Sequence, residues 1–276
     1  MQQLLSNNKT LIRHIIRVLN DQAGQNSVFP DHSVDRAAAA GVLLLLGPRK
    51  NNKNNRVEPC LILNKRSQKV RQPGDLCFPG GSITPGLDSS LAKIFSLPIT
   101  SLGRWPYWPQ WKRSHPQAAR LLALLWATGL RESLEEMRLN PFGARILGPM
   151  PPQSLVMFQR KIYPIVTWIK RQKRFYPNWE VEKILYIPLR ELLEPANYRR
   201  YRLRMKIAAA GEPTPSTRDY LCFRFQNKTD NEILWGATFR ITSIFMEYVF
   251  GFKPPRIEDL PVVEGNLDRT YLTGQN

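Results

Sequence analysis

Three glutamates near the middle of the chain have the type and spacing to bind a divalent cation. Glu132, Glu135 and Glu136 follow a mainly apolar run at residues 118–130, whose length and Ala and Leu content favour a helix over a strand. On a helix these positions are i, i+3 and i+4, so the three carboxylates share one face. Close like charges repel, and a divalent cation with oxygen ligands would relieve that repulsion. Taken alone, three glutamates on a helix are more often a solvated acidic turn.

Two glycines upstream can form the kind of turn that such a site needs. A short strand is expected at residues 75–78, and it ends at a proline followed by Gly80 and Gly81. Two glycines after a proline allow a tight backbone turn and the close approach of a ligand, although alone they indicate only a turn. Arg66 and Arg71 precede this turn. Their guanidinium groups can clamp phosphates with paired donors, and a basic surface pair is the alternative.

These features together resemble the Nudix hydrolases, a family whose sequence box pairs a glycine with a later Arg-Glu-x-x-Glu-Glu helix. In this chain the helix motif runs from Arg131 to Glu136. A narrower similarity to the coenzyme A diphosphatase branch is carried by upstream residues, namely Arg66, Ser67, Arg71, Gly74 and residues 78–81. Later segments extend the resemblance to residues 38–250, namely 163–166, 180–189 and 234–238.

A long segment separates the glycines from the Arg-Glu pair, where the family has a short spacer with an acidic residue. This segment, residues 82–117, is rich in Pro, Ser and Trp and is interpreted as an insertion, with Asp88 as the candidate for the acidic residue. Its aromatic and basic residues can stack on bases or adenine, or the aromatic residues can seal a flap over the core. Arg138 stands where the box normally carries glycine, and Ser133 where a hydrophobic or small residue is usual.

The resemblance implies hydrolysis of a diphosphate bond that links a nucleoside to another group. In the narrower branch the substrate would be coenzyme A or acyl-CoA, and the products 3′,5′-ADP and (acyl-)phosphopantetheine. Mg²⁺ or Mn²⁺ held by the three glutamates would neutralise diphosphate oxygens and activate a water, whose proton one carboxylate would take. Arg131 would orient the glutamates, and Gly80 and Gly81 would bring the loop backbone close to the metal-bearing helix. Glu180 is interpreted as structural, with metal ligation as the alternative.

Two other functions fit the same residues. The first keeps the metal site and changes the substrate to ADP-ribose or a dinucleotide. The second is a basic Nudix-like module that binds a nucleotide or nucleic acid without turnover. The net charge of +18 favours this module mildly. The intact acidic motif argues against it, because a binding module has no use for three crowded carboxylates. A homodimer is an expectation from the resemblance alone.

The elements that would position these residues alternate between strands and helices. Strands at residues 41–46 and 60–63, joined by a polar loop at 48–56, should form a hairpin. Pro164 lies in a further strand and suggests that this strand is at an edge or has a bulge. The other expected elements are strands at 75–78, 144–147, 156–158, 162–169, 180–187 and 220–225, and helices at 118–136, 189–193 and 237–250. This order predicts an α/β fold, and with the resemblance a Nudix-type α/β/α sandwich with a mixed sheet.

The chain is long enough for one large domain with additions. Apolar residues recur at helical spacing over residues 5–21, which predicts an amphipathic helix packed on the domain. We therefore expect an N-terminal helix and linker at residues 1–35, a hydrolase domain at 36–252 that contains the insertion, and an irregular tail at 253–276.

Composition favours polyanionic partners and a reducing compartment. Forty Lys and Arg stand against 22 Asp and Glu, a balance typical of proteins that meet nucleic acid, anionic lipid or phosphorylated small molecules. Three cysteines cannot pair completely and match no zinc pattern. No signal peptide is visible, and the longest apolar run is too short to span a bilayer. A cytoplasmic location is the expectation.

Overall fold

The computed structural model describes residues 2–25, 35, 37–50, 56–155, 160–205, 216–267 and 271. Three parts of the sequence predictions lie outside these residues, namely the linker around Pro30, most of the polar loop at 48–56 and the strand at 156–158. Among the described helices, none is both long enough and apolar enough to pass through a membrane.

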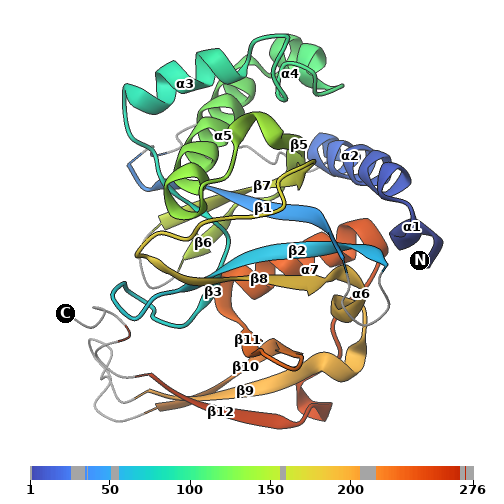
Figure 1. Ribbon diagram of the computed structural model, residues 1–276, viewed down its shortest axis with the longest axis vertical. Coiled ribbons are helices and arrows are strands. Elements are labelled where there is room, and N and C mark those ends of the chain that lie inside the picture. Colours follow the sequence, from blue (N-terminus) through green and yellow to red (C-terminus); the bar gives the residue numbers. More distant parts are fainter. Residues whose placement is uncertain are drawn as a thin grey trace.

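The centre of the fold is a mixed sheet of eight strands (Figure 1). Its strands are β1 (Ala39–Lys50), β2 (Val57–Arg66), β3 (Leu76–Cys77), β4 (Gly80–Ser82), β5 (Ala144–Pro149), β6 (Gln153–Leu155), β7 (Arg160–Ile169) and β8 (Val181–Pro188). The main order is β3-β2-β1-β7-β5, while β4 pairs with β1, β6 with β7 and β8 with β2. The hairpin is confirmed, because β1 and β2 pair antiparallel with Leu45 opposite Ile62. The pairing of β1 with β7 is parallel, which makes the sheet mixed.

Helices cover both faces of this sheet, as a sandwich requires (Figure 1). They are α1 (Gln2–Ser6), α2 (Asn8–Gln25), α3 (Leu87–Phe95), α4 (Trp108–Ser114), α5 (Pro116–Met137), α6 (Leu189–Leu192) and α7 (Gly236–Phe250), with short 3₁₀ turns at Pro141–Gly143, Pro195–Asn197 and Ile257–Asp259. Side chains alternate along a strand, so the leucine run of β1 serves two cores. Leu43 and Leu45 pack in the core that contains α5. Leu44 and Leu46 pack in the core that contains α2 and α7. The predicted α/β/α sandwich is confirmed.

The Trp-rich segment forms α3, α4 and the connection to α5. Its tryptophans Trp105, Trp108 and Trp111 are all buried. Trp105 also donates its indole N–H to the carbonyl oxygen of Leu147 at 3.1 Å. The aromatic residues therefore seal the core beside α5, which is the flap alternative, and these three rings are not available to stack on a base.

A second sheet of four strands lies beyond α7 at the lower end of the molecule (Figure 1). It contains β9 (Tyr198–Met205), β10 (Ser216–Gln226), β11 (Asn231–Leu234) and β12 (Val262–Leu267) in the order β11-β10-β9-β12. The expectation of an irregular tail is therefore wrong over β12, which pairs in parallel with β9. The strand contains Glu264, Gly265 and Asn266, and its partner lies some sixty residues away, so its own sequence carries little strand signal.

Of the two alternatives given for Pro164, the edge strand is wrong, whereas the pairing of β5 with β7 does shift in register, between Ile146 and Gly148. β7 has β1 on one side and β5 and β6 on the other. The proline lies where the pairing passes from β5, which ends opposite Ile165, to β6, which begins opposite Ile162. There its carbonyl accepts a hydrogen bond from the Met150 amide at 2.9 Å. A break between two partner strands thus accommodates the missing N–H.

Candidate active site

Two glycines let α5 lie unusually close to β1, which fixes the height of the glutamate turn above the sheet. A Cβ atom on Gly41 would be 2.5 Å from the carbonyl oxygen of Leu125 in the helix. A Cβ atom on Gly129, on the helix itself, would be 2.6 Å from the side chain of Leu43. Both distances are too short for a side chain, so any larger residue would lift the helix and its carboxylates from the glycine turn.

The helix ends at Arg138, which takes the left-handed conformation with a φ of 56°. Its amide donates to Leu134 at 3.0 Å, and the next amide, of Leu139, donates to Ser133 at 3.2 Å. This is the helix ending that normally uses glycine, because a Cβ atom is strained there. This strain accounts for the glycine that the Nudix box normally has at this position. In this chain arginine takes the same conformation, which lowers the stability of the folded state.

We expect Arg138→Gly to raise the free energy of unfolding by about 0.5–1 kcal/mol, since glycine relieves the strain of the left-handed conformation. The backbone contact from Gln172 to the carbonyl of residue 138, at 2.8 Å, would be kept. Urea unfolding of the wild type, Arg138→Gly and Arg138→Ala tests this. The alanine variant retains the Cβ atom, so a gain of the same size in both variants would contradict the explanation.

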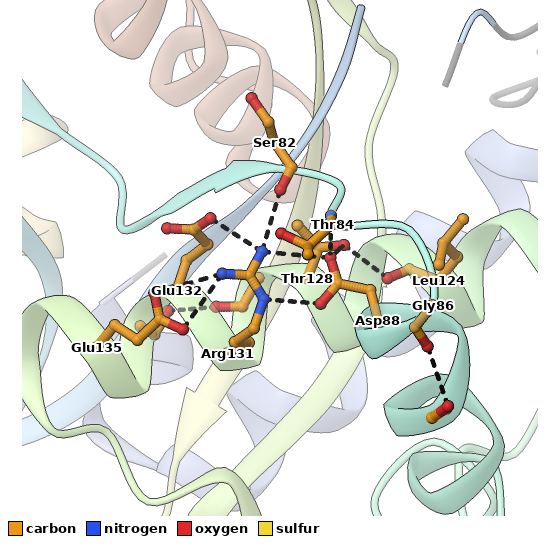
Figure 2. Close-up of polar contacts among 12 residues, drawn as sticks. Ser82, Thr84, Gly86, Asp88, Leu124, Thr128, Arg131, Glu132 and Glu135 are labelled. Atoms are coloured by element: carbon orange, nitrogen blue, oxygen red, sulfur yellow. Dashed lines mark hydrogen bonds and ion pairs between the residues drawn. The ribbon is translucent and has the colours of Figure 1, made fainter. Parts of the chain in front are cut away.

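Arg131 is the centre of a network of charges between α5 and the start of α3 (Figure 2). Its Nε donates to Asp88 Oδ1 at 2.7 Å, and its Nη2 donates to the Ser82 carbonyl at 3.1 Å. The same guanidinium makes ion pairs with Glu132 at 3.0 Å and Glu135 at 3.3 Å. One cation thus joins both glutamates to a buried carboxylate, and it fixes the side-chain directions of the glutamate turn.

Asp88 is fully buried and fully partnered. Besides Arg131, it accepts hydrogen bonds from the Thr84 amide and the Thr128 hydroxyl, both at 2.8 Å (Figure 2). Burial alone would raise the pKa of Asp88, but these bonds and the Arg131 charge hold it below its usual value. The segment interpreted as an insertion therefore contains a residue that pairs with Arg131, and its assignment as the acidic residue of the spacer stays a prediction.

Glu136 lies in the most desolvated part of the site. Burial, and then the nearby Glu132 and Glu180 carboxylates, raise its pKa to about 8 against the opposing effect of hydrogen bonds from the Gly80 amide and Asn64. The Asn64 amide nitrogen donates to Glu136 Oε2 at 2.8 Å. The other amide atom, Oδ1, is buried and accepts no hydrogen bond from a described residue. Crowded carboxylates and an unpartnered oxygen are the surroundings in which a hard cation is stabilised.

Glu132 and Glu135 are arranged differently from Glu136. The Glu132 carboxyl packs against Gly81, where a Cβ atom would be 2.6 Å from its carboxyl carbon. Burial raises the pKa of Glu132, and Arg131 opposes that effect. The Glu135 side chain is 55% exposed and contacts Arg131. With these two side chains turned to the arginine, no three His, Cys, Asp or Glu side chains of the described ranges form a group that could hold a metal ion as placed.

The loop with Arg66 and Arg71 lies beside the carboxylates. Arg66 donates from Nε to the Arg71 carbonyl at 2.6 Å, so its side chain closes the loop. Arg71 is exposed and makes no ion pair with a described residue, which leaves its guanidinium available to an anion. The amide of Ser67 donates to the Glu180 carbonyl at 2.8 Å. The two arginines thus differ in their surroundings, because one shapes the loop and the other faces solvent.

A residue near the C-terminus completes this loop. The Tyr271 hydroxyl donates to Asp75 Oδ2 at 2.6 Å, and Trp235 Nε1 donates to Asp75 Oδ1 at 2.9 Å. The Gln72 amide also donates to the Tyr271 carbonyl at 2.7 Å. Burial raises the pKa of Asp75, and the two side-chain bonds oppose that rise. The loop that precedes the glycine turn is therefore fastened to the second sheet.

The structure thus brings the glutamate helix, Gly80 and Gly81 together and places the arginine loop next to them. Two contributors were not assigned a role from the sequence, namely Asn64 and Thr128. Asn64 carries the one available signal, since it is a polar residue at the end of an apolar strand. Glu180 was interpreted as structural, and it lies close enough to Glu136 to raise its pKa.

Comparison with known proteins gives two informative relatives, while no family model matches the chain. An uncharacterised Nudix hydrolase, NudL, of Pectobacterium atrosepticum is 29% identical over 143 residues, which are 51% of this chain and 55% of that protein. The mouse peroxisomal coenzyme A diphosphatase NUDT7 is 23% identical over 222 residues, 77% of this chain and 74% of that protein. The match therefore spans about half the length of the bacterial relative and three quarters of the mouse one.

Solved structures of Nudix proteins superpose on this chain only with low TM-scores. A Nudix hydrolase from Alicyclobacillus acidocaldarius matches 56% of this chain and 81% of that chain, at 16% identity and a TM-score of 0.34. The NUDIX domain of Shewanella oneidensis NrtR matches 63% and 85%, at 13% identity and a TM-score of 0.35. TM-scores this low leave the assignment to the motifs and to the two sequence relatives. On those grounds this chain is similar to the Nudix hydrolases in its sequence and its motifs.

Proposed function

We propose that this chain is a metal-dependent diphosphatase that cleaves a nucleoside diphosphate-linked substrate. The observation that carries the proposal is the contact of the glutamate turn with the two glycines, because the Glu132 carboxyl packs against Gly81 and the buried Glu136 accepts a hydrogen bond from the Gly80 amide. Coenzyme A or acyl-CoA is the proposed substrate. In that reaction a water attacks one phosphorus of the diphosphate, the bridging P–O bond breaks, and 3′,5′-ADP and (acyl-)phosphopantetheine leave.

The oxygen donors of this turn are of the type that Mg²⁺ or Mn²⁺ takes. Glu132, Glu135 and Glu136 would hold the ion once the first two turn away from Arg131, and Glu180, which lies near Glu136, is a further oxygen donor. When bound, the ion supplies positive charge to diphosphate oxygens and lowers the pKa of a water. Asn64 and the Gly80 amide orient Glu136. Arg131, held by Asp88, limits the directions that the other glutamates can take. Arg71 is placed to pair with a phosphate of the substrate.

Coenzyme A is preferred over ADP-ribose and dinucleotides because two observations agree. The arginine loop lies beside the carboxylates, and the mouse relative carries the name of a coenzyme A diphosphatase. Nucleic-acid binding is less favoured, since part of the basic strand β9 is neutralised within the protein. Arg202 pairs with Asp219 at 2.9 Å, and Arg204 pairs with Glu264 at 2.9 Å.

A reducing, cytoplasmic setting is part of the proposal. Cys60, Cys77 and Cys222 are all free thiols. Burial raises the pKa of each to about 12, so none is activated as a thiolate at neutral pH. Such thiols are expected to be inert rather than catalytic.

Turnover of coenzyme A, ADP-ribose and NADH with Mg²⁺ or Mn²⁺ tests the function. We expect coenzyme A to be cleaved, and we expect Glu136→Gln to lower kcat by at least about a hundredfold, since the charge that holds the ion is lost. Glu247→Gln, an exposed glutamate of α7 that pairs with Lys253, is the matched control and should leave kcat unchanged. Turnover of ADP-ribose or NADH alone would refute the coenzyme A assignment, and no turnover of any of the three would refute the diphosphatase.

A further inference from the structure

The connection from β7 to β8, residues 170–180, is held against the end of α5 and is called the rim loop below. The Asn178 amide donates to the Glu136 carbonyl at 2.8 Å, and the Tyr176 amide donates to the Met137 carbonyl at 3.0 Å. Gln172 bridges the same helix end, because its side chain donates to the Arg138 carbonyl at 2.8 Å and accepts from the Asn140 amide at 2.7 Å. The rim loop is therefore positioned by the helix that carries the glutamates.

The rim loop also contacts the arginine loop. The Glu180 carbonyl accepts a hydrogen bond from the Ser67 amide at 2.8 Å, and the Glu180 amide donates to Asn178 Oδ1 at 2.9 Å. Asn178 and Glu180 therefore join the two parts of the proposed site, the glutamate turn on one side and the arginine loop on the other. Trp179 stands between them in the chain.

Two large aromatic side chains of the rim loop are exposed although the loop is well fixed. Tyr176 is 62% exposed and Trp179 is 63% exposed. The seven tryptophans all belong to the described residues, and Trp179 is the exposed one among them. Five of the others are buried and Trp235 is partly buried. An indole left in water is costly unless a ligand covers it, and a rigid exposed ring is a suitable surface for a nucleobase.

The rim loop also carries four exposed cations, Lys170, Arg171, Lys173 and Arg174. None of the four makes an ion pair with any residue that the structure describes. Some cations outside the loop have acidic partners, as in the pairs of Lys183 with Asp230 and Glu232, and others, such as Arg71, have no ion pair with a described residue. Four uncompensated charges and two exposed rings within one loop match the two parts of a nucleotide, its phosphates and its base.

We propose that the rim loop is a binding subsite for the nucleotide end of the substrate. The base stacks on Trp179, with Tyr176 beside it, and the cations pair with a phosphate other than those of the cleaved diphosphate. The ligand class is a purine nucleoside bisphosphate. The inference rests on the proposed function, because it assumes that the diphosphate lies at the glutamate turn.

Calorimetric titration of the full chain with 3′,5′-ADP and with 5′-AMP, without metal, tests the subsite apart from turnover. We expect Trp179→Ala to weaken binding of both ligands roughly tenfold, the size of one lost base stack, and Trp179→Phe to retain most of the affinity. The double variant Lys173→Ala, Arg174→Ala should remove the preference for 3′,5′-ADP over 5′-AMP. Phe142→Ala is the matched control, since that ring is 73% exposed and contacts Phe95 of α3.

Unchanged affinity in Trp179→Ala, an equal loss in Phe142→Ala, or no binding by the wild type would each overturn the subsite. The coenzyme A assay separates this result from the proposed function. Turnover by the wild type with an unaltered KM in Trp179→Ala would leave the diphosphatase standing without the subsite. Nucleotide binding that depends on Trp179, in a chain with no turnover, would leave the subsite standing without the diphosphatase.

Discussion

Replacing Glu136 by glutamine is expected to stabilise the cation-free protein at pH 8 by on the order of 2 kcal/mol and to change little at pH 5. Burial, and then Glu132 and Glu180, raise the pKa of this carboxyl from 4.5 to about 8 in the folded protein. Between these values the folded chain keeps a proton that the unfolded chain has lost. Stability therefore falls as pH rises through this window, and glutamine, which resembles the protonated form, escapes the fall.

Urea unfolding in the presence of a chelator, at pH 5 and pH 8, measures this difference. Glu247→Gln again serves as the control, because its carboxylate is exposed and its loss should change stability by less than about 0.5 kcal/mol at either pH. A Glu136→Gln variant that is less stable than the wild type at pH 8 would show that the carboxylate is well stabilised without a cation. Because Mg²⁺ or Mn²⁺ would compete with the proton, added metal should stabilise the wild type more at pH 8 than at pH 5.

Replacing Asp88 by alanine is expected to lower the free energy of unfolding by about 3–5 kcal/mol, the range for breaking a buried ion pair from one side. The change leaves Arg131, whose side chain is only 10% exposed, without its main partner. It also removes the acceptor for the Thr84 amide and the Thr128 hydroxyl. Unsatisfied buried donors carry a cost of their own, so the loss should be among the largest that a single polar substitution causes in this chain.

Two further variants distinguish this explanation from a general effect of removing aspartate. Asp219→Ala breaks an exposed pair with Arg202 of the same bidentate kind and should cost far less. The double variant Asp88→Ala, Arg131→Met should recover part of the loss, because no charge then remains buried without a partner. Chemical denaturation of the four proteins gives the comparison. Equal losses for Asp88→Ala and Asp219→Ala, or no recovery in the double variant, would contradict the role given to the Asp88–Arg131 pair.

The sequence predicted β1, β2, β5, β7 and β8 and the helices α2, α5, α6 and α7, because their signals are local. The leucine run of β1 and the apolar stretch of α5 each show their period within one segment. Of the second sheet, only the strand at residues 220–225, part of β10, was predicted. In β9, arginines alternate with tyrosines and a leucine, and the charges become acceptable only beside Asp219 of β10 and Glu264 of β12. These partners are set by strand register, which no single segment reveals.

The candidate site, like the fold, was predictable only where its residues form a compact sequence motif. The glutamates and glycines form compact motifs, so the sequence identified them together with Arg131. Asn64 lies in β2 and Glu180 directly before β8, and they come close to Glu136 only after β2, β8 and α5 have packed together. The exposed Trp179 was also missed, since its sequence neighbours give no indication that the ring remains uncovered. The part of the site that could not be predicted therefore consists mostly of contacts between residues that are far apart in the sequence.

The fastening of the loop by Tyr271 has a consequence for where a functional unit ends. The family resemblance stops near residue 250, so a chain shortened there would keep the glutamate helix, the glycine turn and Arg71. It would lose β12 and the tyrosine that binds Gln72 and Asp75. A fragment that ends where the resemblance ends would therefore retain its reactive groups. Its arginine loop would be poorly ordered, because the contacts of Gln72 and Asp75 with Tyr271 would be missing. In this chain a residue outside the resemblance holds a loop that lies within it.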